Sequence, residues 1–208
     1  MILKAVDLSA KHAQKVIFSA ISLELEKGQK LAIIAPNGSG KSTLLELLAG
    51  LKERDSGALN LFDEQMLTLK DFKKIRQKIG FLFQNSDEQF VCSTVLDDVS
   101  FSLLAHGLCQ SEKLAHEKAL EMLEMLNISH LKDEICLNLS GGQKRLVALA
   151  GVLVCEFELI FLDEPSAPLD KNATDLVANI LKNSTSSMII TSHDKEFISK
   201  ITQNIYTL

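Results

Sequence analysis

The sequence predicts an α/β protein with a mostly parallel sheet, a small antiparallel β layer and an inserted helical lobe. The uninterrupted apolar runs 31–34 and 159–162 have the length and composition of strands that are buried on both faces of a parallel sheet. Residues 23–25 and 58–61 instead alternate between apolar and polar side chains, which is typical of half-exposed antiparallel strands. From residue 85 to about residue 138, helical signals replace these strand signals.

The first buried strand leads into a phosphate-binding loop. Residues 35–43 read Ala-Pro-Asn-Gly-Ser-Gly-Lys-Ser-Thr and are followed by leucines at helical spacing, so strand, loop and helix are all present. In such a P-loop the backbone N–H groups surround the phosphates, Lys41 supplies a positive charge and Ser42 places its hydroxyl on Mg²⁺. The usual pattern begins with glycine, but Ala35 precedes Pro36 and is therefore directed to an extended conformation that alanine tolerates. We expect ATP to be bound by Asn37, Gly38, Ser39, Gly40, Lys41, Ser42 and Thr43.

Two helices are expected in the lobe. Thr94 is a good N-cap for a run that continues through Phe101 to Gly107. An apolar face of a second helix is indicated by Leu120, Leu123 and Leu126.

Residues 139–143 read Leu-Ser-Gly-Gly-Gln and mark another helix start. Ser140 is a good N-cap, and the apolar run 146–150 follows the two glycines. The unpaired N–H groups and the positive end of the helix dipole suit a phosphate, and the glycines let an anion approach the backbone. For a Ser-Gly-Gly seen alone, an ordinary serine-capped helix after a turn would be the better interpretation.

The apolar run 159–162 ends in the adjacent acids Asp163 and Glu164. Ligands collect at the carboxyl ends of parallel strands, so Asp163 is placed to hold Mg²⁺ and Glu164 to orient or deprotonate a water molecule. The alternative is a pair of solvated acids that start a turn before Pro165. Because the two acids accompany a P-loop, a role in binding Mg²⁺ and water is strongly favoured over this alternative. The strand-like runs 188–190 and 205–206 then return the chain to the parallel core.

These three motifs, in this order, resemble a subunit of an ABC-type ATPase from end to end. The resemblance implies one domain of residues 1–208. Within it, 1–84 and 156–208 would form a P-loop NTPase core, and 85–155 a helical lobe that carries the 139–143 motif, called the signature below.

The resemblance also implies further site residues. Gln84 would contact Mg²⁺ and the attacking water, and His193 would contact the γ-phosphate. The expected catalytic residues are Glu164, His193 and Gln84, and the expected Mg²⁺ ligands are Ser42, Gln84 and Asp163. Each ATP would lie between two copies, or two paralogues, arranged head to tail. The expected contacts of the second subunit are Ser140, Gly141, Gly142, Gln143 and Asp170.

Two positions depart from the family pattern. His12 stands where the family places the aromatic ring that stacks on adenine. An imidazole can stack there, although a surface-loop histidine is the alternative. Pro168, in the segment 166–170, stands where the family often has glycine or a small residue, and proline fixes φ and removes a donor.

Residues 83–90, 94–101 and 144–153 narrow the resemblance to the ATPases of energy-coupling-factor importers. Those systems take up transition-metal ions such as cobalt or nickel, or vitamins. The expected function is therefore the ATP-binding and ATP-hydrolysing subunit of such an importer, for a transition-metal ion. A vitamin importer and a soluble ABC ATPase are the alternatives. Many relatives carry an additional carboxyl-terminal region, whereas this sequence ends at Leu208, so dimerisation is expected to rest on the nucleotides and an integral membrane transport component.

The segment after Gln84 is the expected docking site for that membrane component. Phe90 and Val91 would give an apolar floor, and Asp87 and Glu88 an acidic rim, for a basic helix of the partner. The alternative is that Phe90 only packs the core of the lobe.

Composition sets the remaining limits. A chain of 208 residues with 46% hydrophobic residues, 24% charged residues and a net charge of −5 suits one core of ordinary size and argues against nucleic acid as a partner. The longest apolar stretch, 146–155, is shorter than the roughly 20 residues that a spanning helix needs. We expect a cytoplasmic protein, peripheral on the inner face of the cell membrane.

The four dispersed cysteines lack a Cys-x-x-Cys pair, which argues against structural zinc and a disulfide framework.

Overall fold

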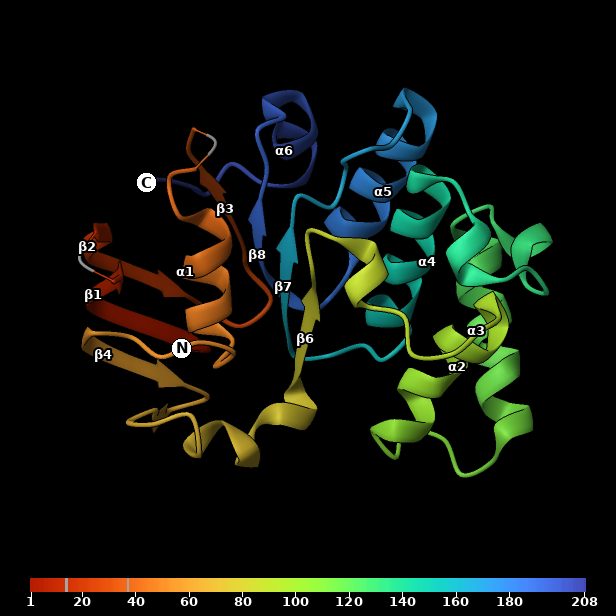
Figure 1. The fold of residues 1–208 in the computed structure, drawn as a ribbon, viewed down its shortest axis with the longest axis horizontal. Helices are drawn as coiled ribbons and strands as arrows, with labels where there is room; N and C mark the ends of the chain where they lie inside the picture. The colour runs from red at the N-terminus through yellow and green to blue at the C-terminus, as the bar shows by residue number, and fades with distance from the viewer. Residues whose placement is uncertain (14, 37) are drawn as a thin grey trace.

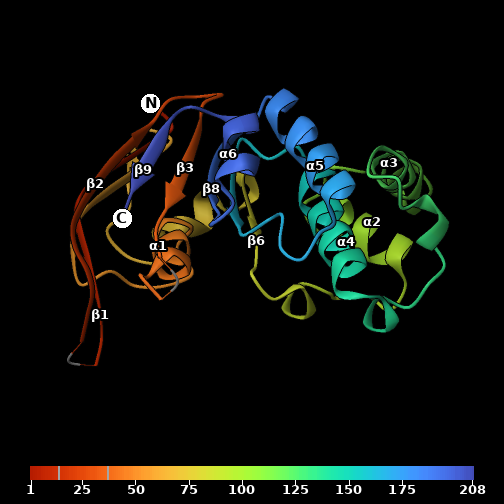
Figure 2. The same ribbon diagram turned by 90° about the horizontal axis from the view of Figure 1, so that it is seen from above.

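The computed structural model of the chain describes residues 1–13, 15–36 and 38–208. Within them, a parallel and an antiparallel sheet stand side by side, and the helices lie mainly beyond the parallel sheet (Figures 1 and 2). The antiparallel sheet has the order β2-β1-β4-β5, with β1 Leu3–His12, β2 Lys15–Leu25, β4 Ser56–Leu61 and β5 Glu64–Gln65. The expected antiparallel layer is thus confirmed.

The second sheet is parallel throughout its described strands. Its order is β6-β7-β8-β3-β9, with β3 Lys30–Ile34, β6 Ile79–Leu82, β7 Leu159–Asp163, β8 Ser187–Thr191 and β9 Ile205–Thr207. The expected parallel core is confirmed, and β7 shows why its sequence is uninterrupted. Leu159 and Phe161 belong to the core cluster shared with α1 (Lys41–Leu48), whereas Ile160 and Leu162 face the cluster on the opposite side of the sheet.

The helices beyond β6 and β7 form two layers. Next to the sheet lie α4 (Gly141–Leu153), α5 (Lys171–Asn183) and α6 (Lys195–Ile201). Farther out, α2 (Val95–Ala105) and α3 (Glu112–Met125) pack on α4, as Figures 1 and 2 show. Short 3₁₀ turns connect these elements: η1 Asp71–Lys74, η2 Arg76–Lys78, η3 Ser86–Glu88, η4 Ser129–Leu131 and η5 Cys136–Asn138.

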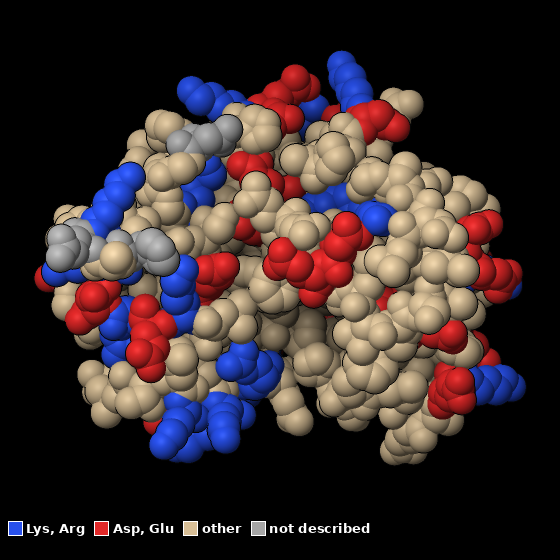
Figure 3. Space-filling view, in the orientation of Figure 1, with Lys and Arg blue, Asp and Glu red and all other residues tan. Residues whose placement is uncertain are grey.

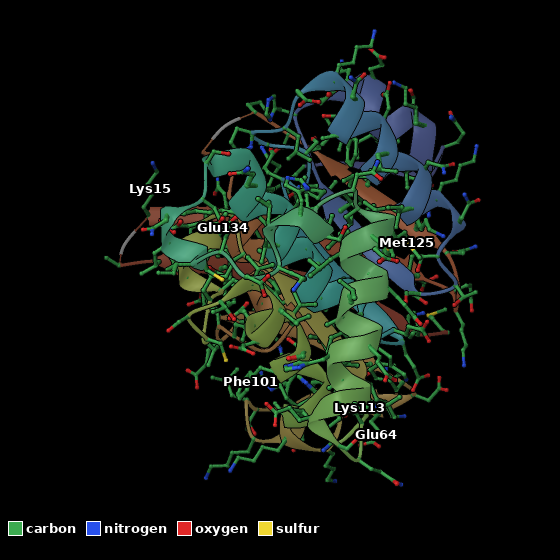
Figure 4. The ribbon with its side chains drawn as sticks, turned by 90° about the vertical axis from the view of Figure 1, so that its right-hand side faces the viewer. Lys15, Glu64, Phe101, Lys113, Met125 and Glu134 are labelled. Atoms are coloured by element: carbon green, nitrogen blue, oxygen red, sulfur yellow. The ribbon has the colours of Figure 1, made fainter. Side chains whose placement is uncertain are left out.

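Local signals explain where the outer helices begin. Thr94 caps α2 by accepting from the Asp97 N–H, as the sequence predicts, and Ser111 caps α3 in the same way. Figure 4 views this side of the molecule, with Phe101, Lys113 and Met125 labelled on the outer helices. The predicted apolar face of α3 is only partly right. Leu123 and Leu126 are buried as predicted, but the buried face also contains two alanines, four and eight residues before Leu123, and Leu120 is half-buried.

A buried carboxylate fixes the chain between β6 and α2. Asp98 is 6% exposed, and its Oδ1 accepts hydrogen bonds from the backbone N–H groups of Val91 (2.7 Å) and Cys92 (2.8 Å). Burial raises the pKa of Asp98, and the two hydrogen bonds oppose that shift. Among the described residues, no helix is both long and apolar enough to cross a bilayer.

Candidate active site

The helix that follows β3 begins without a side-chain cap. Its N-cap residue is Gly40, which has φ +95°, and Gly38 precedes it with φ +76°. A β-carbon at Gly40 would be strained in this left-handed conformation and would also lie 2.4 Å from Cγ2 of Ile17. The first N–H groups of α1 are therefore left for an anion, as a P-loop requires.

Lys41 is held at the mouth of this loop. It is 7% exposed, and its ammonium donates to the carbonyl oxygens of Ala35 (2.7 Å) and Pro36 (3.2 Å). The Ser39 hydroxyl oxygen is buried and has no hydrogen-bond partner among the described residues. An unpaired donor beside a lysine suits a phosphate oxygen. Asn37, expected to bind the nucleotide, lies outside the described residues.

Asp163 and Glu164 stand at the carboxyl end of β7, facing the loop. Asp163 is 2% exposed, and its carboxylate accepts from the Thr191 hydroxyl at 2.6 Å. Glu164 is 7% exposed and adopts φ +51°, a conformation that glutamate rarely takes. Its backbone N–H donates to the Thr191 carbonyl oxygen at 3.1 Å, which fixes this turn against β8. Strain of this kind persists where surrounding contacts hold it, and it is common at active sites.

His193 holds the Glu164 carboxylate from the far side. Its Nδ1 lies 2.9 Å from Glu164 Oε2, and its backbone N–H donates to the same oxygen at 3.3 Å. The imidazole is 63% exposed, whereas the carboxylate is 9% exposed. The exposed imidazole and the backbone N–H of His193 therefore both contact one oxygen of the enclosed carboxylate.

A cavity of about 400 Å³ joins the loop and the two acids. It is lined by Ile17, Gly38, Gly40, Lys41, Ser42, Thr43, Gln84, Asp163 and Glu164. The Ser42 hydroxyl and the Gln84 side-chain oxygen are 3.5 Å apart, and the Asp163 carboxylate lines the same space. Hydroxyl, amide and carboxylate oxygens are hard ligands of the kind Mg²⁺ prefers, so these residues fit that ion.

The signature lies elsewhere on the surface. Ser140 and Gln143 form a reciprocal capping box at the start of α4, with hydrogen bonds of 2.9 and 3.4 Å. Neither these residues nor Gly141 and Gly142 line the cavity that holds Lys41. A β-carbon at Gly142 would lie 3.0 Å from the Pro168 carbonyl oxygen, so Pro168 packs against the start of α4.

Two other predicted contacts are also outside the cavity. Asp170 caps α5 by accepting from the Ala173 N–H at 2.9 Å. His12 ends β1, and its side chain lies outside the described residues.

Three residues of the site are not predicted by the sequence motifs. Ile17 lines the cavity, Thr191 anchors both acids, and the guanidinium of Arg145 lies behind them. Only Arg145 had a visible signal, because it is a charged residue at the start of the apolar run of α4. The contacts of Ile17 and Thr191 depend on how separate strands meet.

The predicted docking segment has a different surface from the one expected. Phe90 packs against the core of the lobe, so the packing alternative is right and the predicted apolar floor is wrong for Phe90. Val91 is 69% exposed. Lys144 pairs with Asp87 at 2.7 Å, which offsets part of the acidic rim. Figure 3 shows acidic side chains gathered near the middle of the face drawn, with basic side chains beside them.

Comparison with known proteins places this site in a family. The family model described as ABC transporter matches residues 18–167, which include the P-loop, the signature and both acids. The chain belongs to this ABC transporter family. The predicted ABC-type ATPase and its P-loop fold are thereby confirmed.

Three similar proteins come from the same family. The energy-coupling factor transporter ATP-binding protein EcfA1 of Streptococcus pyogenes is 36% identical over 193 residues, which cover 91% of this chain and 68% of that protein. The structure of cbiO1 from Clostridium perfringens, described as part of the ABC transporter complex cbiONQ, has 31% identity and a TM-score of 0.81 and covers 99% of this chain and 84% of that one. A dimeric ATP-binding cassette in a post-hydrolysis state with ADP and phosphate has 25% identity and a TM-score of 0.87, and covers 100% and 94% of the two chains.

Proposed function

We propose that this chain is the ATP-binding and ATP-hydrolysing subunit of an energy-coupling-factor importer for a transition-metal ion such as cobalt or nickel. The observation that carries the ATPase part is the cavity in which Lys41, Ser42 and Asp163 meet Glu164. The importer part is supported by the similarity to EcfA1 and to cbiO1, which is named as part of a transporter complex.

The proposed chemistry follows from the side chains of the cavity. The N-terminus of α1 and Lys41 bind the phosphates of ATP, which places the γ-phosphate toward Glu164. Glu164 accepts a proton from the attacking water, and His193 holds the Glu164 carboxylate in place at 2.9 Å. Gln84 orients the water from the end of β6. Ser42, Gln84 and Asp163 would hold Mg²⁺, which offsets the negative charge of the phosphates.

The signature serves a second copy in this proposal. Ser140 and Gly141 are exposed and outside the cavity, so their open helix end can take a phosphate only from another molecule. Two copies, or this chain and a paralogue, would enclose each ATP head to tail, with Asp170 of the second subunit near the nucleotide. ATP then stabilises the closed dimer, and hydrolysis reopens it. His12 stays a predicted contact of the adenine.

The subunit would work on the cytoplasmic face of the membrane, bound to an integral transport component. The solute is decided by that component, so a vitamin importer is the nearest alternative. A soluble ABC ATPase not linked to transport is the more distant one, and neither alternative changes the nucleotide chemistry.

Purification from native membranes tests this proposal. The tagged chain should copurify with a multi-spanning membrane protein, and vesicles containing the complex should take up labelled cobalt or nickel ions when ATP is supplied. The same complex with Glu164→Gln is the matched control and should assemble without uptake. Uptake of a labelled vitamin instead of the metal ions would favour the vitamin alternative. An active ATPase without a membrane partner would favour the soluble one.

A further inference from the structure

Arg145 is the largest fully buried side chain of the described residues. It lies on α4, five residues after Ser140, and is 0% exposed. Its Nη1 donates to the carbonyl oxygens of Phe83 (2.5 Å) and Gln84 (3.5 Å), and its Nη2 donates to the carbonyl oxygen of Asp163. One guanidinium therefore contacts both chain segments that carry the proposed water- and Mg²⁺-binding residues.

The position of these carbonyl groups explains why an arginine fits there. The ladder between β6 and β7 ends at the pair Leu82 and Leu162, and the two strands then separate. Phe83 and Asp163 come directly after this pair, and the carbonyl oxygens of both accept hydrogen bonds from Arg145. The planar fork of Arg145 reaches both, which a single ammonium group cannot do.

The charge of Arg145 is also close to the two acids. Burial lowers the pKa of Arg145 to about 10, and the negative charges of Asp163 and Glu164 oppose that shift. The guanidinium is thus still positive at neutral pH.

Stability alone gives little reason for a charge at this place. Nε of Arg145 is buried without a hydrogen-bond partner among the described residues, and taking a charge out of water is costly. A role in the reaction accounts better for the cost of burying it.

We propose that Arg145 is a positioning residue for ATP hydrolysis, which fixes the Gln84 segment against the end of β7. It acts from the helix that also carries the signature. The proposal rests on the proposed function only in requiring that the chain hydrolyse ATP.

Two substitutions separate geometry from charge. Arg145→Met removes both the hydrogen bonds and the charge, so we expect kcat to fall at least about tenfold. Arg145→Lys keeps the charge but loses the planar fork that reaches both segments, so kcat should also fall. Monomer affinity for ATP should stay within about twofold for both, since Lys41 and its loop are not touched.

Leu149→Ala is the matched control, because Leu149 is fully buried on the same helix. It should lower the melting temperature while kcat per bound nucleotide and the affinity for ATP stay at wild-type values. The proposal is overturned if both Arg145 variants keep wild-type kcat per nucleotide-binding site. If Arg145→Met does not fold, the kcat of Arg145→Lys decides alone. Wild-type protein without ATPase activity overturns both proposals, whereas an active wild type with unaffected variants overturns only this one.

Discussion

The helices α1 and α4 both begin at glycines, but their first turns are built for different situations. The start of α1 has a left-handed Gly40, no side-chain cap and a cavity that its own chain encloses. The start of α4 has a complete capping box and lies on the surface. Both helix ends attract an anion, but they differ in which subunit holds that anion. The first can bind phosphate within one subunit, and the second is suited to a phosphate held by another.

The largest expected effect concerns the acid that only the α1 site possesses. Glu164→Gln keeps the shape of the side chain but cannot accept the proton, so kcat should fall at least about a hundredfold while Mg-ATP still binds. The unconsumed ATP should also hold two subunits together. Turnover assays and light scattering with and without ATP measure both results. Near-normal hydrolysis would remove Glu164 from its proposed role.

Alanine substitutions at the two glycine positions sharpen the comparison. Gly40→Ala is strained by its φ of +95° and meets Ile17 at 2.4 Å, so it should cost roughly 1–3 kcal/mol of stability and weaken monomer binding of ATP. Gly141→Ala meets only the Pro168 ring at 3.4 Å and should leave both quantities near wild type. Chemical denaturation and nucleotide titration of the monomers compare them. Equal loss of monomer binding in both would contradict the division of labour between the helices.

A stability effect that leaves both helix starts untouched concerns the segment between β6 and α2, which Asp98 holds. Asp98→Ala leaves the N–H groups of Val91 and Cys92 without their acceptor and should lose roughly 1–3 kcal/mol. Asp98→Asn retains an oxygen acceptor and should be as stable as wild type at neutral pH. Because burial raises the pKa of Asp98 above its unfolded value, its contribution is most favourable at acidic pH and decreases as pH rises through the folded pKa. Denaturation at several pH values should show this decrease in wild type and not in Asp98→Asn.

Some features of the fold and the site can be predicted from local sequence patterns, and others cannot. The P-loop, both acids and the caps at Thr94 and Ser140 are local patterns, and the structure places them where local rules predict. The features that the sequence does not predict depend on contacts between residues that are far apart in the chain. Phe90 packs inward because the lobe core closes over it, and Arg145 is buried because two strand ends present carbonyl groups to it.

Distant contacts also explain why some predictions from the sequence are only partly right. Leu120 fits a helical period as well as Leu123 does, but α4 covers the face that contains Ala115 and Ala119. The left-handed backbone of Glu164 likewise has no signal in the residue type, since it follows from the Thr191 hydrogen bonds. Assignments that need a second subunit, such as those of Ser140, Gln143 and Asp170, stay predictions.

The most direct test of an ATP site shared between two subunits is to mix two inactive variants. Ser140→Arg should bind ATP as a monomer but not hydrolyse it, because its own cavity is intact and its signature is blocked. Lys41→Ala has the opposite defect.

In a mixed dimer, one composite site combines the intact cavity of the first variant with the intact signature of the second. We predict partial ATPase activity only in the mixture, rising with the fraction of mixed dimers. A mixture as inactive as its components, or Ser140→Arg monomers that fail to bind ATP, would contradict the assignment of the two helix starts to two different subunits.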